Sequence, residues 1–179
     1  MVEKEVFQVN IEGKKVDVTV RLAENEKDLE QIIHIENVCF PPAEAAKKED
    51  FINRFKAFKE NFVVAEIDHN ILIGFINGNT TDKPELPDEL YHDTSLHKPD
   101  GDYQTVFGLD VLPEYRNQGV AAHLMNYLIN ISKERGKKGM VLTCKDRLIH
   151  YYEKFGYEHK GVSKSNHGGS VWNDMVYIF

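Results

Sequence analysis

The chain has 179 residues, of which 41% are hydrophobic and 28% charged, a composition typical of a globular protein. Its formal net charge of -7 argues against a surface that binds nucleic acid. The two cysteines, Cys39 and Cys144, fit neither a disulfide framework nor the spacing of a metal site. We therefore expect one domain over residues 1–179, with no metal.

The beginning of the chain, "MVEKEVFQVN", lacks the apolar core of a signal peptide. No later run of residues approaches the length of a membrane span. These features favour a cytoplasmic protein. We expect a monomer or a homodimer that has neither a membrane nor a nucleic-acid partner.

The first elements predicted are a β-hairpin and a helix. Residues 6–24 alternate between apolar and polar side chains on both sides of "EGKK", and residues 1–15 supply an extra N-terminal strand. Residues 25–40 carry apolar side chains at helical spacing, and Asn25 is placed to cap the first turn.

A second helix, a second hairpin and a long loop come next. Residues 40–61 predict a helix with Pro42 in its first turn. Residues 62–79 predict two strands around "DHN". Residues 80–101 lose the periodicity and contain three prolines and many acids, which is typical of a long loop that forms a lid or one wall of a pocket.

The last part of the chain alternates strands with helices. Residues 103–112 predict a strand, and an amphipathic helix runs from Val120 until Gly136 stops it. The remaining predictions are a buried strand over 140–144, a short helix over 146–157 and strands over 158–163 and 170–179.

The order of these elements defines the fold class. It predicts an α/β domain with a mixed, mostly antiparallel twisted sheet and flanking helices. The central β-α-β unit, from Thr105 to Cys144, should be parallel and right-handed.

The stretch "LPEYRNQGVA" joins a predicted strand to a predicted helix and reads as a phosphate site. The first N–H groups of a helix have no internal partner and attract anions. Gly119 and Ala121 leave this backbone open, and Arg116 adds a positive charge. Neither G-x-G-x-x-G nor G-K-[ST] is present. The alternative is a tight connection that uses small residues only for packing.

Two motifs decide between these readings. "GLDVLPEYRNQGVAAHLM" resembles the acyl-CoA motif of the GNAT acetyltransferase superfamily, and "HYYEKFGY" resembles its second signature at the expected distance. The resemblance covers roughly residues 16–179. "IENVCFPPAEAA", "FINGN" and "GVSKSNHGGSVWNDM" are similar to the arylalkylamine (serotonin-type) N-acetyltransferase branch.

The resemblance implies acetyl-CoA as co-substrate. The main chain of Leu109, Asp110 and Val111 would hold the pantetheine arm, and the Val111 N–H would polarise the thioester carbonyl. The remaining cofactor contacts implied are Arg116, Asn117, Gln118, Gly119, Val120, Ala121 and Ala122.

The resemblance makes Tyr152 the general acid that protonates the leaving sulfur, since a phenol is protonated at neutral pH. Its alternative role is that of one more aromatic residue on an amphipathic helix. The general base is not identified, because Thr105 and Phe107 occupy the positions of the two histidines of the branch. The candidates for the base are His167, Glu44 and His150.

Phe40, Pro41 and Trp172, with the loop 80–101, are the candidates for contacts with the amine substrate. Three functions stay open at this point. The first is an N-acetyltransferase of small primary amines, such as an arylalkylamine or a polyamine. The second is a GNAT enzyme that acts on a protein Lys or N-terminus. The third is a non-catalytic acyl-CoA-binding sensor.

Overall fold

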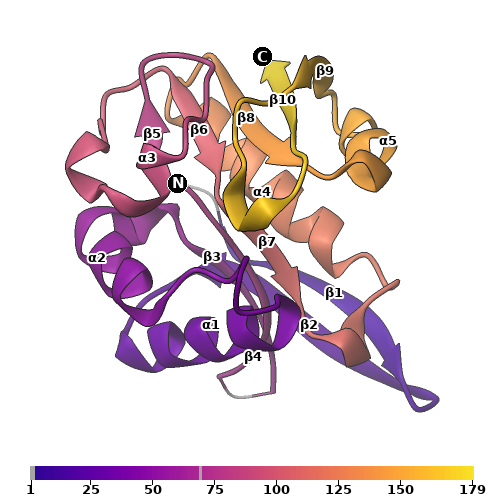
Figure 1. Cartoon of the computed structure of the whole chain (residues 1–179). Coiled ribbons are helices and arrows are strands. Elements are labelled where there is room, and N and C mark those ends of the chain that lie inside the picture. Colours follow the sequence, from indigo (N-terminus) through magenta and orange to yellow (C-terminus); the bar gives the residue numbers. More distant parts are fainter. Residues whose placement is uncertain (1–2, 69) are drawn as a thin grey trace.

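The computed structural model describes residues 3–68 and 70–179. Figure 1 shows helices packed around a sheet that divides into two parts. The strands are β1 (Glu5–Ile11), β2 (Lys14–Leu22), β3 (Val63–Ile67), β4 (Ile71–Asn77), β5 (Thr80–Thr81), β6 (Tyr103–Val106), β7 (Gly108–Val111), β8 (Gly139–Cys144), β9 (Glu158–Val162) and β10 (Asn173–Ile178). The α-helices are α1 (Glu26–Cys39), α2 (Lys48–Phe58), α3 (Glu89–His92), α4 (Val120–Glu134) and α5 (Ile149–Glu153).

The described strands form two five-stranded sheets, in the orders β1-β2-β3-β4-β7 and β5-β6-β8-β10-β9. The strand predicted over 103–112 divides at Phe107, so that β6 pairs with β8 and β7 pairs with β4. The β6–β8 pairing is parallel and all other pairs are antiparallel, which confirms the mixed, mostly antiparallel arrangement. Gly78 lies directly against the Thr105 carbonyl, where no Cβ atom fits, and this close approach brings the two sheets together.

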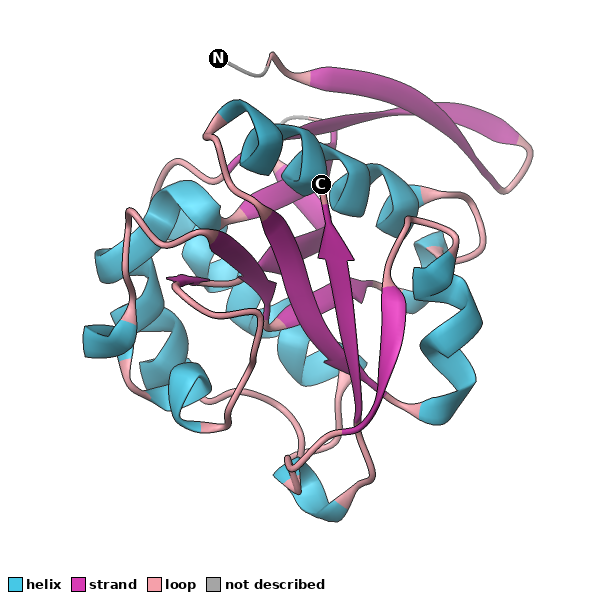
Figure 2. Ribbon diagram, turned by 90° about the horizontal axis from the view of Figure 1, so that it is seen from above, coloured by secondary structure: helices cyan, strands magenta, loops and turns pink. Residues whose placement is uncertain are grey.

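The N-terminal predictions are confirmed. The β1–β2 hairpin turns at Glu12 and Gly13, both of which have positive φ. Asn25 caps α1 by accepting a hydrogen bond from the Asp28 N–H. Both views show the hairpin extending beyond the rest of the fold (Figures 1 and 2).

The helix predicted over 40–61 is wrong at its start, because α2 begins at Lys48. Pro42 therefore lies in a turn rather than in a helix. The Ala46 N–H donates to Glu36 Oε2 at 2.8 Å instead of continuing a helical ladder, and the Asp50 side chain accepts from the Lys47 N–H at 3.3 Å. The turn between α1 and α2 is thus fixed by a side chain of α1.

Two further boundaries differ from the prediction. The segment 80–101 contains the short strand β5 and the helix α3, so it is not a loop throughout. The final strand begins at Asn173 rather than at 170, because the Ser163 N–H pairs with the Trp172 carbonyl before regular pairing of β10 starts.

Helices cover both faces of the first sheet. On one face, α4 contributes Leu124, Met125 and Leu128, which are fully buried. On the other face, α1 and α2 contribute Ile32 and Phe51 to a second apolar cluster. Burial of each such side chain stabilises the fold by about 1.5–3 kcal/mol.

An ion-pair network anchors α1 to the sheet. Arg21 of β2 donates to Asp28 of α1 at 2.8 Å and to Glu66 of β3 at 3.0 Å. Burial alone would raise the pKa of Asp28, but the hydrogen bonds from Arg21 and from the Glu24 N–H outweigh it and lower that pKa. The helix that carries Glu36 and Cys39 is therefore held in a fixed position. None of the helices in the described residues is long and apolar enough to cross a membrane.

Candidate active site

The separation of β6 from β7 leaves β7 as an open strand edge. The Leu112 N–H donates to the Ile73 carbonyl at 2.8 Å. The N–H and C=O groups of successive residues in a β-strand point to opposite sides. Asp110, two residues before Leu112, therefore also directs these groups towards β4, whereas Leu109 and Val111 direct theirs towards the open edge. Of the three predicted main-chain contacts, only Leu109 and Val111 thus lie on that edge.

The N-terminus of α4 follows β7 and is not covered by side chains. Gly119 caps the helix with φ 85°, in the left-handed region, and no side chain caps this end. A Cβ atom added to Gly119 would come no closer than 3.9 Å to the atoms around it, the nearest being His123 Cδ2. The first N–H groups of this 15-residue helix, including those of Val120, Ala121 and Ala122, therefore have neither an intrahelical partner nor a capping side chain.

Two predicted contacts have other partners in this structure. The Arg116 Nε donates to the Val111 carbonyl at 2.9 Å, which ties the guanidinium to β7. The Gln118 side chain accepts from the Asn10 N–H at 2.6 Å and donates to the Asn10 carbonyl at 2.5 Å. The segment before α4, with Asn117 at φ 64°, is thereby fastened to the N-terminal hairpin.

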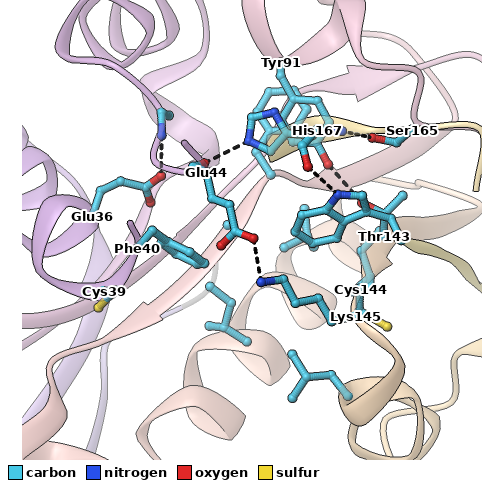
Figure 3. Close-up of a pocket in the computed structure, with 18 of the residues that line it drawn as sticks. Glu36, Cys39, Phe40, Glu44, Tyr91, Thr143, Cys144, Lys145, Ser165 and His167 are labelled. Atoms are coloured by element: carbon cyan, nitrogen blue, oxygen red, sulfur yellow. Dashed lines mark hydrogen bonds and ion pairs between the residues drawn. The ribbon is translucent and has the colours of Figure 1, made fainter. Parts of the chain in front are cut away.

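A cavity of about 360 Å³ lies between α1, α2, α3, β6–β8 and the segment before β10 (Figure 3). It is mainly aromatic and apolar, with several charged groups. The residues that line it are Glu36, Cys39, Phe40, Pro41, Glu44, Ala46, Arg54, Asn77, Tyr91, His92, Val106, Phe107, Gly108, Leu109, Leu142, Thr143, Cys144, Lys145, Arg147, Leu148, Tyr152, Ser165, His167 and Trp172.

The three predicted substrate contacts, Phe40, Pro41 and Trp172, all line this cavity. The Trp172 Nε1 donates to the His167 carbonyl at 2.9 Å, which fixes the indole. The segment 80–101 contributes Tyr91 and His92 and so forms one wall, as predicted.

Tyr152 lines the same cavity and is 9% exposed. Its ring makes edge contacts with Tyr151 at 5.2 Å and Tyr157 at 6.0 Å between centroids. Burial raises the pKa of the Tyr152 phenol, because the interior disfavours the phenolate. The hydroxyl is therefore held in its protonated form.

The structure brings two of the three candidate bases to the cavity. His167 Nε2 donates to the Glu44 carbonyl at 2.8 Å. The Glu44 carboxylate pairs with Lys145 Nζ at 2.6 Å, and this contact lowers the pKa of Glu44 (Figure 3). His150 instead lies on the surface, 96% exposed and paired with Glu153, outside the cavity lining.

The two positions that carry histidine in the serotonin-type branch offer no base here. Thr105 is fully buried, and its hydroxyl donates to Asn79 Oδ1 at 2.9 Å. Phe107 lines the cavity, and the Arg54 guanidinium lies 4.7 Å from the centre of its ring.

Sequence reasoning missed Glu36 and Arg54 as residues of the site. Both are buried, with 6% and 3% exposure, and both line the cavity. Arg54 donates to Asn77 Oδ1 at 3.2 Å and to the Tyr91 carbonyl at 2.9 Å. Each of the two could have been noticed as a charged side chain on the apolar face of a predicted amphipathic helix. Glu36 interrupts this face in the first helix, and Arg54 interrupts it in the second.

Within residues 3–68 and 70–179, no group of three or more His, Cys, Asp or Glu side chains is arranged to hold a metal ion. The arrangement consists of an uncapped helix N-terminus, an open strand edge and a cavity behind that edge. A helix N-terminus without a capping side chain suits a bound anion, and a mostly apolar cavity suits a small molecule.

The comparisons with known proteins identify the family. The family model described as "Acetyltransferase (GNAT) family" matches residues 29–157. The chain therefore belongs to the GNAT acetyltransferase family, as its two motifs predicted. The open first turn of α4 and the free edge of β7 fit an acyl-CoA, which supplies an activated acyl group as a thioester.

Individual relatives agree with this assignment. The serotonin N-acetyltransferase of Mesocricetus auratus is 30% identical over 113 residues, which are 63% of this chain and 53% of that protein. The chain thus spans about half the length of that relative. An uncharacterized N-acetyltransferase of Bacillus subtilis, YkwB, is 26% identical over 161 residues, 84% of this chain and 70% of that protein.

A solved structure supports the fold. The loading GNATL domain of CurA from Lyngbya majuscula matches with a TM-score of 0.77 and 16% identity, over 90% of this chain and 97% of that one. At this identity the match establishes the fold alone.

Proposed function

We propose that the protein transfers the acetyl group of acetyl-CoA to the nitrogen of a small primary amine, with an arylalkylamine as its acceptor, by direct attack in a ternary complex. The observation that carries this proposal is the aromatic-walled cavity that adjoins the open edge of β7. The 30% identity to a serotonin N-acetyltransferase over 113 residues supports the same choice of acceptor.

On the cofactor side, the main-chain groups of Leu109 and Val111 bind the pantetheine arm, and the Val111 N–H polarises the thioester carbonyl. The pyrophosphate binds at residues 117–122, where the first turn of α4 is uncovered. Fixed donors of this kind stabilise the oxyanion that develops during attack, often as the largest catalytic contribution.

On the leaving-group side, Tyr152 donates its proton to the sulfur as the C–S bond breaks. Its burial supports this role, because a phenol with a raised pKa carries its proton throughout the physiological range.

On the acceptor side, the ring of the amine lies among Phe40, Tyr91, His167 and Trp172. Tyr91 and His167 stack nearly parallel, with centroids 6.0 Å apart and 9° between their planes. A small planar ligand suits such walls, because aromatic rings prefer offset-stacked or edge contacts. The ordered segment 80–101 and the Phe40–Pro41 turn enclose the cavity, which favours a small amine over an extended peptide.

The test is release of free thiol from acetyl-CoA by the purified protein with a panel of acceptors. The panel contains tryptamine, phenethylamine, spermidine, an aminoglycoside and a lysine peptide. We expect release with the two arylalkylamines and at least about tenfold lower kcat/KM with the others, the equivalent of ~1.4 kcal/mol.

Preference for spermidine or the peptide would contradict the acceptor class while preserving the reaction. Binding of acetyl-CoA without release in the presence of any amine would support a non-catalytic acyl-CoA sensor instead.

A further inference from the structure

Two buried carboxyl groups lie near each other at one wall of the cavity. Glu36 of α1 is 6% exposed, and Asp110 of β7 is 2% exposed. A Cβ atom added to Gly108 would lie 3.3 Å from Asp110 Oδ1 and 3.7 Å from Glu36 Oε1. Both carboxyl groups therefore lie close to Gly108, beside the break between β6 and β7.

The surroundings of the two carboxyl groups favour a proton on Asp110. Neither carboxyl oxygen of Asp110 receives a hydrogen bond from a described residue, whereas Glu36 Oε2 accepts from the Ala46 N–H at 2.8 Å. Two ionised carboxylates in contact repel each other in the interior, and one proton turns the contact into a hydrogen bond. Burial first, and then the neighbouring Glu36, raise the pKa of Asp110 well above its ordinary value. These effects favour the protonated form of Asp110.

The other charged and titratable groups around the pair do not replace this proton. They are Cys39 on α1, Arg116 after β7 and Arg54 on α2. Arg116 lowers the pKa of Asp110, but less than burial and Glu36 raise it. Both arginines donate hydrogen bonds to neutral oxygen atoms of other residues.

Glu36 gives the pair access to the cavity, which it lines together with Gly108, Leu109 and Tyr152. Figure 3 shows the Glu36 carboxyl across the cavity from His167, bound at one oxygen to the backbone. Glu44 lines the cavity as well, but its charge is paired with Lys145. Among the described residues, Glu36 has no such cationic partner.

We propose that Glu36 is the general base that receives the proton of the acceptor ammonium, and that Asp110 is the positioning residue that holds a shared proton against it. This inference rests on the proposed acetyl transfer. One N–H bond of the ammonium breaks, and its proton bonds to Glu36 Oε1. The freed nitrogen lone pair forms the N–C bond and the C–S bond breaks.

A second proton leaves the nitrogen and replaces the one that Tyr152 gives to the sulfur, so that Tyr152 ends as a neutral phenol. Glu36 returns its proton to solvent. The sum is ammonium plus thioester giving amide, thiol and one proton, so atoms and charges balance. A primary amine is mostly an ammonium ion at neutral pH, so a base beside it is needed to remove this proton.

The test is the pH dependence of kcat/KM for the wild type, Glu36→Gln and Asp110→Asn, with Glu158→Gln as a control on the exposed surface. Glu36→Gln should lower kcat/KM about 100-fold at neutral pH, and the rate should recover as alkaline pH deprotonates the amine in solution. Asp110→Asn should lose less than about fivefold, because its amide still donates a hydrogen bond to Glu36. Glu158→Gln should match the wild type.

A Glu36→Gln profile equal to that of the wild type would overturn the assignment of the base. An Asp110→Asn loss as large as that of Glu36→Gln would show that Asp110 acts ionised, which would overturn the shared proton.

Thermal unfolding gives a readout that does not depend on turnover. The folded chain keeps the Asp110 proton while the unfolded chain releases it above about pH 4, so wild-type stability falls as the pH rises through that window. Asp110→Asn lacks this loss. Its unfolding midpoint, relative to the wild type, should therefore rise as the pH increases above about 4.

If the difference between the unfolding midpoints of Asp110→Asn and the wild type does not change with pH, Asp110 does not carry a buried proton, whether or not the enzyme is active. If the midpoints change with pH as expected but no amine is acetylated, the proposed function is wrong, whereas the proton on Asp110 is supported.

Discussion

At the scale of single residues, Tyr152 illustrates how position gives an ordinary side chain a chemical task. Its ring is one of several aromatic groups that pack α5 against the second sheet. Its hydroxyl, however, belongs to a buried side chain that lines the cavity. Burial disfavours the phenolate, so the hydroxyl holds the proton that the proposed reaction delivers to the sulfur.

Replacement of Tyr152 by Phe removes the hydroxyl and keeps the ring. We expect kcat to fall about 100-fold, because a proton donor in the transition state is lost, while the Kd for acetyl-CoA changes by less than about twofold. Steady-state kinetics and calorimetry measure the two quantities. Tyr151→Phe is the matched control, since Tyr151 is adjacent but does not line the cavity, and it should retain wild-type turnover. Wild-type turnover in Tyr152→Phe, with chemistry rate-limiting, would exclude the acid role.

At the scale of elements, α4 joins the edge of β7 to the proposed phosphate site. Gly119 at φ 85° lets the chain turn sharply from the end of β7 into the helix, and the missing side chain leaves the first N–H groups open. Gln118 fastens the same turn to Asn10 of β1. The N-terminal hairpin thus steadies the position of the helix N-terminus.

Gly119→Glu should abolish measurable acetyl-CoA binding, because it places bulk and negative charge at the pyrophosphate. Any residue other than glycine is also strained at this φ. The control must therefore be a second glycine with positive φ, replaced by the same residue. Gly136 provides it, with φ 75°, no atom within 4 Å of an added Cβ and a position at the opposite end of α4. Calorimetry with Gly136→Glu should give wild-type affinity. Equal affinity in both variants would place the pyrophosphate elsewhere.

At the scale of the whole molecule, the features that follow from neighbours in sequence could be predicted. The Asn25 cap, the turn at Gly13 and the end of α4 near Gly136 each depend on local backbone preferences. The motif around Arg116 indicated the family, and the family's fold in turn predicts the parallel pairing of β6 with β8.

The features that depend on distant contacts could not be predicted. The start of α2 is set by Glu36, which takes the Ala46 N–H across ten residues. Glu36 comes near Asp110 only after α1 packs on β7. The spacing of the two residues in the sequence therefore does not predict that they are neighbours. Arg116 and Gln118 were expected at the phosphate, and their tertiary partners lie on β7 and β1 instead.

The proposed cofactor edge and the proposed acceptor cavity adjoin at β7, and one binding measurement tests this arrangement directly. The probe is a conjugate of CoA and tryptamine joined through an acetyl bridge, titrated calorimetrically against CoA alone. We predict that the conjugate binds at least about tenfold more tightly than CoA, ~1.4 kcal/mol, because its indole fills the aromatic cavity while its CoA portion occupies the edge of β7 and the start of α4. A matching conjugate with a peptide should show no such gain. Equal affinities of the tryptamine conjugate and CoA would contradict the joined site.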